Sequence, residues 1–156
     1  MTVTQSTSAD SIQNPNLYEQ DFYQWIETTV NLLRERKLNQ LDYDNLIEEL
    51  ESMGRSEKRA VKSNLEVVLL HLLKWKYEPE YRSRSWQNSI REHRKRIHKL
   101  LQDSPSLNQW LTDVFDECYQ VARNDAAYET GLPIEQFPSK SPFLVEETLN
   151  SNYLPD

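Results

Sequence analysis

Residues 67–75, VVLLHLLKW, are apolar on almost every side of a helix, and this stretch limits the fold more than any other part of the sequence. Val61 and Leu65 extend the same helical spacing toward the N-terminus. A helix that is apolar all round must be enclosed by other elements, so we expect it to lie at the centre of a bundle. It should end near Tyr77, because Pro79 cannot continue a helix.

The rest of the chain shows further helical patterns and no alternation typical of strands. It contains only two glycines, which suits long helices, since glycine destabilises a helix interior by roughly 1 kcal/mol. Helices are predicted at residues 17–36, 42–53, 57–77, 84–102, 105–130 and 142–150. The sequence therefore predicts an all-α protein, a single-domain helical bundle of about five to six helices over residues 17–156, after a disordered polar tail at 1–16.

The junction at Gly54 has two interpretations. Glycine often terminates a helix, and Ser56 with Glu57 is typical of a cap that starts the next one. Alternatively, one kinked helix runs through Gly54. The sequence does not decide between them.

The charge of the chain limits its partners. The 156 residues carry a net charge of −7, which opposes non-specific binding to nucleic acid or anionic membranes. The mean hydropathy is −0.81, and no stretch approaches the ~20 apolar residues of a membrane span. The N-terminus lacks the basic and apolar regions of a signal peptide, and Cys118 is the only cysteine, so no internal disulfide can form. We expect a cytoplasmic protein with no membrane partner.

Three carboxylates, Asp44, Glu48 and Glu51, recur at i, i+4 and i+7 and therefore share one helix face. Such a row can hold a divalent cation if a second helix supplies further ligands. Bundle-type metal sites use a Glu-x-x-His motif, which this chain lacks. A solvated acidic face is the favoured interpretation, and neither a metal nor a cofactor is expected.

Residues 82–99 form a basic helix in which Glu92 is the one acid, and aromatic residues lie beside its start. These residues and a histidine of the central helix make up a candidate binding patch: His71, Trp75, Tyr81, Arg82, Arg84, Trp86, Arg91, Arg94 and Lys95. Cations neutralise phosphates, and aromatic rings and arginine stack on bases, so the patch suggests nucleic-acid binding. The isoelectric point of about 5.0 favours two other interpretations, namely pairing with the acidic 42–53 helix or a solvated face.

The aromatic residues also have a structural interpretation. Trp75 and Trp86 flank a tight corner between two helices, with Pro79 as the breaker. Their rings would then cover the end of the core, while Arg82 and Arg84 stack over aromatic rings at the rim. A recognition pocket would use the same residues.

Two further residues are interpreted as structural. His71 is expected to be a half-buried histidine with a local hydrogen-bond partner, because no nucleophile or orienting acid lies near it in sequence. Cys118 lies on the inner stripe of its helix, where a thiol behaves as a small apolar residue.

Four segments of this sequence have a specific order and spacing: 45–86 (NLIEEL to YRSRSW), SPSL at 104–107, ETGLP at 129–133 and FPSKSPF at 137–143. They resemble the bacterial family called domain of unknown function 29, over about residues 17–155. The resemblance implies a compact all-helical domain. It supplies no established activity, so no catalytic residue follows from it.

Three functional hypotheses result. The first, favoured by the absence of a reaction motif, is a non-enzymatic interaction module that binds an unknown protein partner or a second copy of itself. In the self-associating form, residues 82–99 of one copy meet residues 42–57 of the other. The second is a nucleic-acid-associated module that uses the 82–99 helix. The third is an enzyme whose site joins Glu48 or Glu51 to His71 or Arg91 across helices.

Overall fold

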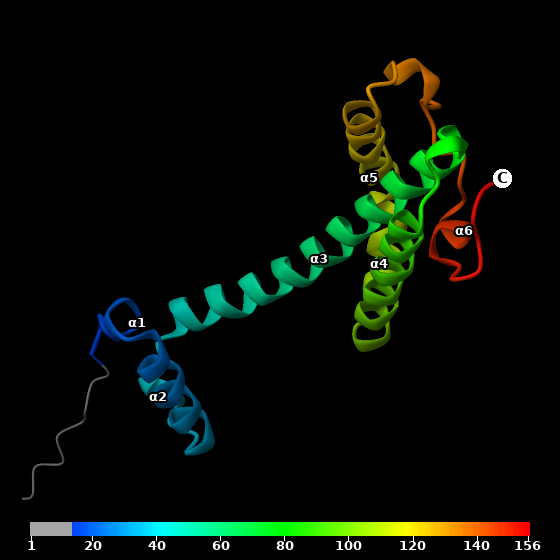
Figure 1. The fold of residues 1–156 in the computed structure, drawn as a ribbon. Coiled ribbons are helices and arrows are strands. Elements are labelled where there is room, and N and C mark those ends of the chain that lie inside the picture. Colours follow the sequence, from blue (N-terminus) through cyan, green and yellow to red (C-terminus); the bar gives the residue numbers. More distant parts are fainter. Residues whose placement is uncertain (1–13) are drawn as a thin grey trace, which may run out of the picture. The chain divides into compact units, whose positions relative to one another are not determined.

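The computed structural model describes residues 14–156, which form helices and connecting turns without a strand. The helices over this range are α1 (Leu17–Gln20), α2 (Phe22–Arg34), η1 (Leu38–Gln40), α3 (Tyr43–Tyr77), η2 (Pro79–Tyr81), α4 (Arg84–Asp103), α5 (Leu107–Thr130), η3 (Ile134–Gln136) and α6 (Val145–Leu149), as Figure 1 shows. The predicted all-α fold is confirmed. None of the helices in this range is long and apolar enough to cross a membrane.

Residues 1–13 of the predicted tail at 1–16 lie outside the described residues. Residues 14–16 form a turn before α1, in which the backbone N–H of Leu17 donates to the carbonyl oxygen of Asn14 at 2.9 Å. The disorder of the tail stays a prediction.

The chain divides into two compact units, a first unit that ends at Gly54 and a second unit from Arg55 to Asp156. Helix α3 runs through Gly54 without a break. The interpretation of one continuous helix is therefore confirmed, and the predicted restart at Ser56 is wrong. That residues 17–156 form a single domain stays a prediction.

In the first unit, the predicted first helix is broken at Asp21. The backbone of Asp21 has a φ of −152°, and its carboxylate accepts a hydrogen bond from the N–H of Gln24 at 2.9 Å, so Asp21 caps α2. After α2 the chain turns at Arg36, whose φ of 59° lies in the left-handed region. Asp42 caps α3 as predicted, because its carboxylate accepts from the N–H of Asn45 at 3.4 Å.

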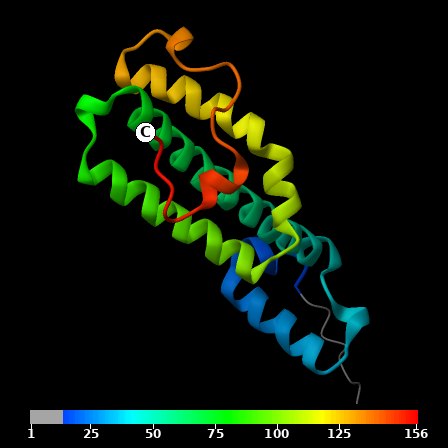
Figure 2. The ribbon, with the colours of Figure 1, turned by 90° about the vertical axis from the view of Figure 1, so that its right-hand side faces the viewer.

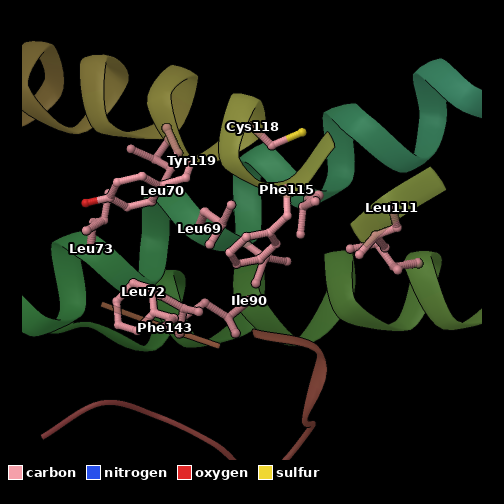
Figure 3. Packing of buried hydrophobic residues seen from close by; sticks show 14 of the residues in the cluster. Leu69, Leu70, Leu72, Leu73, Ile90, Leu111, Phe115, Cys118, Tyr119 and Phe143 are labelled. Atoms are coloured by element: carbon pink, nitrogen blue, oxygen red, sulfur yellow. The ribbon is translucent and has the colours of Figure 1, made fainter. Parts of the chain in front are cut away.

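The second unit holds the hydrophobic core, which α3, α4 and α5 build side by side (Figure 2). The α3 side chains predicted to be buried are fully enclosed: Val61, Leu65, Val68, Leu69, Leu72 and Leu73. Figure 3 shows Leu69 of α3 facing Phe115 of α5, with Ile90 of α4 below them. Each such large apolar side chain contributes roughly 1.5–3 kcal/mol when it is fully buried.

Two helix boundaries of the second unit follow their sequence signals. Ser83 caps α4, since its hydroxyl accepts a hydrogen bond from the N–H of Trp86 at 3.2 Å. Gly131 ends α5 with a φ of 72°, and its N–H donates to the carbonyl oxygen of Ala127 at 3.0 Å. Glycine suits this position because the left-handed conformation is unfavourable for other residues.

Two predicted helix starts lie too early in the chain. Helix α5 begins at Leu107 rather than at 105, because a turn from Ser104 comes first. Helix α6 begins at Val145 rather than at 142. The hydroxyl of Ser141 does not cap a helix there; it accepts from the N–H of Phe143 at 3.1 Å and forms a local turn.

Cys118 lies in the core without any exposed area, and burial raises the pKa of its thiol to about 12. The thiolate is the reactive species. At about pH 8 we therefore expect an aromatic disulfide reagent to label the folded protein roughly a hundredfold or more slower than the urea-unfolded protein. Rapid stoichiometric labelling of protein with native circular dichroism would contradict this placement.

Candidate functional site

The structure separates the predicted binding patch into two places in the second unit. Trp75, Tyr81, Arg82 and Trp86 lie at the corner where α3 gives way to α4. Arg84, Arg91, Arg94 and Lys95 line a groove along α4. His71 lies on α3 and belongs neither to the corner nor to the groove.

At the corner, cations of the chain cover both tryptophan rings. The guanidinium of Arg82 lies 5.1 Å from the ring centroid of Trp75, and its Nε donates to the carbonyl oxygen of Trp75 at 2.8 Å. Over Trp86 lies the ammonium of Lys74, at 4.6 Å from the centroid, and not the predicted Arg84. Lys74 also pairs with Glu129 at 2.9 Å. These contacts agree with the structural interpretation of the corner, except that Lys74 takes the place of Arg84.

The groove runs along α4, and the C-terminal segment forms its other wall. It consists of two adjoining hollows of about 750 Å³ and about 600 Å³, and both are lined by Arg91, Arg94, Ser151 and Asn152. Along α4 its cationic and imidazole side chains are Arg84, Arg91, Lys95, His98 and Lys99. Helical geometry spaces the first and last of these by roughly 22 Å.

The exposed cations of this groove form no ion pair within residues 14–156. Across residues 14–156, the ion pair formed by α4 joins Arg96 to Glu92 at 3.7 Å, whereas Arg84, Arg91, Lys95 and Lys99 have no carboxylate within ion-pair distance. Asp103 lines one end of the groove as its one acidic residue. The groove therefore concentrates positive charge on a protein whose net charge is −7.

Arg94 is not the exposed phosphate contact that the sequence predicted, because its side chain is only 2% exposed. Its guanidinium donates to three backbone carbonyl oxygens: Nε to Thr148 at 2.7 Å, Nη1 to Tyr153 at 2.8 Å and Nη2 to Glu147 at 3.2 Å. It thereby holds α6 and the following segment against α4, which Figure 2 shows side by side.

Helical spacing was the signal that could have placed Arg94 inside. Ile90, Arg94, Ile97 and Leu101 recur at i, i+4, i+7 and i+11, and all four are buried. The sequence analysis assigned Arg94 to the charged face because of its type. Its position in the buried stripe decides where it lies.

The buried charge of Arg94 has no carboxylate counterpart among the described residues. Burial lowers the pKa of the guanidinium to about 10, which leaves it charged at neutral pH. The three carbonyl oxygens satisfy its hydrogen bonds without neutralising it. A fixed positive charge therefore lies beneath the groove.

Two histidines of the second unit donate a hydrogen bond from Nδ1. Nδ1 of His71 donates to the carbonyl oxygen of Val67 at 2.9 Å, the local partner that the structural interpretation predicts. Nδ1 of His93 donates to the amide oxygen of Asn64 at 2.7 Å, since that oxygen only accepts. Burial lowers the pKa of both imidazoles.

The predicted acidic face, Asp44, Glu48 and Glu51, lies exposed on the part of α3 that belongs to the first unit. From residue 14 onward, no group of three or more His, Cys, Asp or Glu side chains is placed to hold a metal ion. Pairing of this face with the 82–99 helix stays a prediction, as does an enzyme site that joins it to His71 or Arg91.

A surface that the sequence analysis missed lies on the first unit. Of residues 14–54, only Trp25 and Thr29 are buried. The large apolar side chains of this unit that are at least 37% exposed, here called the apolar face, are Phe22, Tyr23, Ile26, Val30, Leu33, Leu38, Tyr43, Ile47, Leu50 and Met53.

The apolar face comes from α2, η1 and the start of α3. The hydroxyl of Tyr18 in α1 donates to Glu49 of α3 at 2.5 Å, and the indole N–H of Trp25 in the first turn of α2 donates to Asp42, the cap of α3, at 3.2 Å. The rings of Trp25 and Tyr18 pack edge to face at 5.1 Å. These contacts join α1 and the first turn of α2 to the start of α3, and the ten side chains of the apolar face stay exposed.

Replacing Arg94 by lysine should destabilise the protein. An ammonium cannot reach three carbonyl oxygens in the planar fork of a guanidinium, so the loss of charge-assisted hydrogen bonds should lower the free energy of unfolding by roughly 2–4 kcal/mol. Arg91→Lys, in the exposed part of the groove, should change it by less than about 0.5 kcal/mol. Urea unfolding measures both, and equal effects would contradict the clamp.

The lowered pKa of His71 should make stability depend on pH. The unfolded imidazole binds a proton near pH 6.5 and the folded one at lower pH, so its contribution is fully present above about pH 6.5 and is lost as the pH falls through that value. His71→Gln should therefore lose less unfolding free energy than the wild type between about pH 7.5 and about pH 5.5. Identical losses in urea titrations would show that His71 does not titrate differently on folding.

Comparison with known proteins gives a family and no activity. No curated protein matches the chain, and no solved structure matches it. The model of the family described as domain of unknown function DUF29 matches residues 17–154, which is nearly all of the described range and includes both the groove and the apolar face. The chain therefore belongs to the DUF29 family.

Proposed function

We propose that this protein is a non-enzymatic protein-interaction module that associates with a second copy of itself through the apolar face of the first unit. The exposure of ten large apolar side chains within residues 14–54 carries the proposal. A water-exposed surface of this kind is stabilised when another apolar surface covers it. The free thiol of Cys118 supports a cytoplasmic location as part of the proposal.

The size of the apolar face suits a dimer. A large aromatic side chain has roughly 200 Å² to bury and an aliphatic one roughly 100 Å². At exposures from 37% to 69%, the ten side chains present on the order of 700 Å². This sum is close to the ~800 Å² that each partner buries in a standard interface.

The small core of the first unit also favours a second copy. Of its described residues, 14–54, only Trp25 and Thr29 are buried, so this part of the chain has little core of its own and gains most from a partner that covers its apolar side chains. A second copy related by a two-fold axis buries the same surface of each chain, which is the commonest form of a closed homo-oligomer.

This arrangement differs from the charge pairing that the sequence suggested between residues 82–99 and 42–57. Apolar contact supplies the free energy of association here, and it should persist at high salt. Charge pairing of exposed groups should weaken as salt rises.

Charged substitutions on the apolar face should dissociate the dimer. We expect the wild type to sediment as a dimer at roughly 100 μM, and Ile26→Lys/Leu50→Glu to sediment as a monomer, with a dissociation constant raised at least roughly a hundredfold. Sedimentation velocity at low and high salt measures this. The matched control is Tyr128→Glu, which changes a 90% exposed aromatic residue of α5 and should remain a dimer.

Two results would overturn the proposal. A wild type that stays monomeric at that concentration would show that no second copy covers the apolar face. A double variant that keeps its native circular dichroism and remains dimeric would place the interface elsewhere in the chain.

A further inference from the structure

We propose that the groove along α4 binds an acidic peptide segment of a partner protein. The groove belongs wholly to the second unit, so this binding is separate from the self-association proposed above. The positive charge of the groove, its length and the chemistry of its walls carry the inference.

The positive charge of the groove favours the binding of an anion. Arg84, Arg91 and Lys95 come from one face of α4, are exposed, and have no ion-pair partner among residues 14–156. Four or more like charges along one side of a helix repel one another. An anionic ligand in the groove removes that repulsion, and it does so at no cost to an existing ion pair.

Arg94 adds a charge that the ligand would feel more strongly than a surface charge. It lines both hollows, its side chain is 2% exposed, and its three hydrogen bonds go to uncharged carbonyl oxygens. A buried charge is less screened by water and salt than an exposed one. A carboxylate in the groove would compensate a charge that the fold itself leaves unneutralised.

The walls of the groove suit a peptide better than a nucleic acid. No Phe, Tyr or Trp side chain lines either hollow, so base stacking would be limited to the His98 ring and the arginine guanidinium groups. The tryptophans that the sequence placed beside the basic helix lie at the corner, where Arg82 and Lys74 cover them. Away from the groove, the net charge of −7 repels a long polyanion.

The uncharged polar side chains of the walls match a peptide backbone. Gln87, Asn88, Gln102 and Asn152 line the hollows, and each amide both donates and accepts hydrogen bonds. A groove of roughly 22 Å accommodates about six to seven residues of extended chain at ~3.3 Å per residue. Acidic side chains on such a segment would reach the cations of α4, while its backbone meets the amides.

The test is a binding titration with the full-length protein. A fluorescein-labelled glutamate heptamer is the peptide probe, and a labelled thymidine heptanucleotide is the single-stranded DNA probe. We expect anisotropy to show saturable binding of the peptide that weakens as salt rises, and tighter binding of the peptide than of the DNA. The charge reversal Arg91→Glu/Lys95→Glu should weaken peptide binding roughly tenfold or more.

A matched control has the same change in net charge outside the groove. Arg59→Glu/Lys140→Glu alters two exposed cations that do not line it, and should change the peptide affinity less than about twofold. Arg91→Gln/Lys95→Gln is a milder groove variant in case the reversal disturbs the fold, and should give an intermediate loss. Ile26→Lys/Leu50→Glu should leave peptide binding unchanged, which separates this proposal from the dimer.

Three outcomes would overturn the inference. Absence of saturable peptide binding by the folded wild type would show that the groove does not bind an acidic peptide. Equal losses of peptide affinity in the groove and control variants would show that net charge, and not the groove, determines the binding. Tighter binding of the thymidine heptanucleotide, lost in the groove variants, would assign the same groove to nucleic acid instead.

Discussion

The second unit depends on the enclosure of α3. From Val61 to Leu73 this helix carries apolar side chains on most of its sides, and six of them are fully buried. Two neighbouring helices cover only part of such a surface. The segment after α5 supplies the remainder: Phe137 has no exposed area and packs edge to face on Tyr77 of α3 at 5.5 Å between ring centroids.

That segment has little regular structure of its own, so side chains of the helices hold it by its backbone. Arg123 of α5 donates to the carbonyl oxygens of Phe137 and Ile134 at 3.0 Å and 3.2 Å. Arg94 of α4 does the same for the stretch around α6. Of the carbonyl groups that the two arginines bind, those of Ile134 and Glu147 also accept the backbone N–H that closes η3 or α6. The clamp at Arg94 also forms the groove, because it fixes the C-terminal segment as a wall opposite α4.

The two units differ in how far they satisfy their apolar residues. The second unit encloses its apolar stripes, whereas the positive charge along its groove remains without a counter-charge among the described residues. The described part of the first unit contains α1, α2, η1 and the start of α3, and these elements leave ten large apolar side chains exposed. The proposed homodimer would cover the exposed apolar side chains of the first unit. The proposed peptide would neutralise the charge along the groove of the second unit.

Local sequence determined the secondary structure well, since its signals act within a few residues. Asp42, Ser83 and Gly131 act as caps through contacts with their own neighbours, and the apolar spacing of α3 forces burial on any arrangement of partners. Cys118 was placed correctly for the same reason. The break at Asp21 was not predicted, and the helix through Gly54 was one of two interpretations, because a cap or a terminator residue is compatible with more than one backbone path.

Only the tertiary structure decided which charged and apolar residues face solvent. Arg94 is held by three carbonyl oxygens, two from α6 and one from Tyr153, that lie more than fifty residues away in sequence. Lys74, which pairs with Glu129 of α5, lies over Trp86. Phe22 and Leu50 are exposed because none of the described elements of residues 14–54 covers them. Periodicity states which side of a helix is apolar, and long-range contacts decide whether anything lies against it.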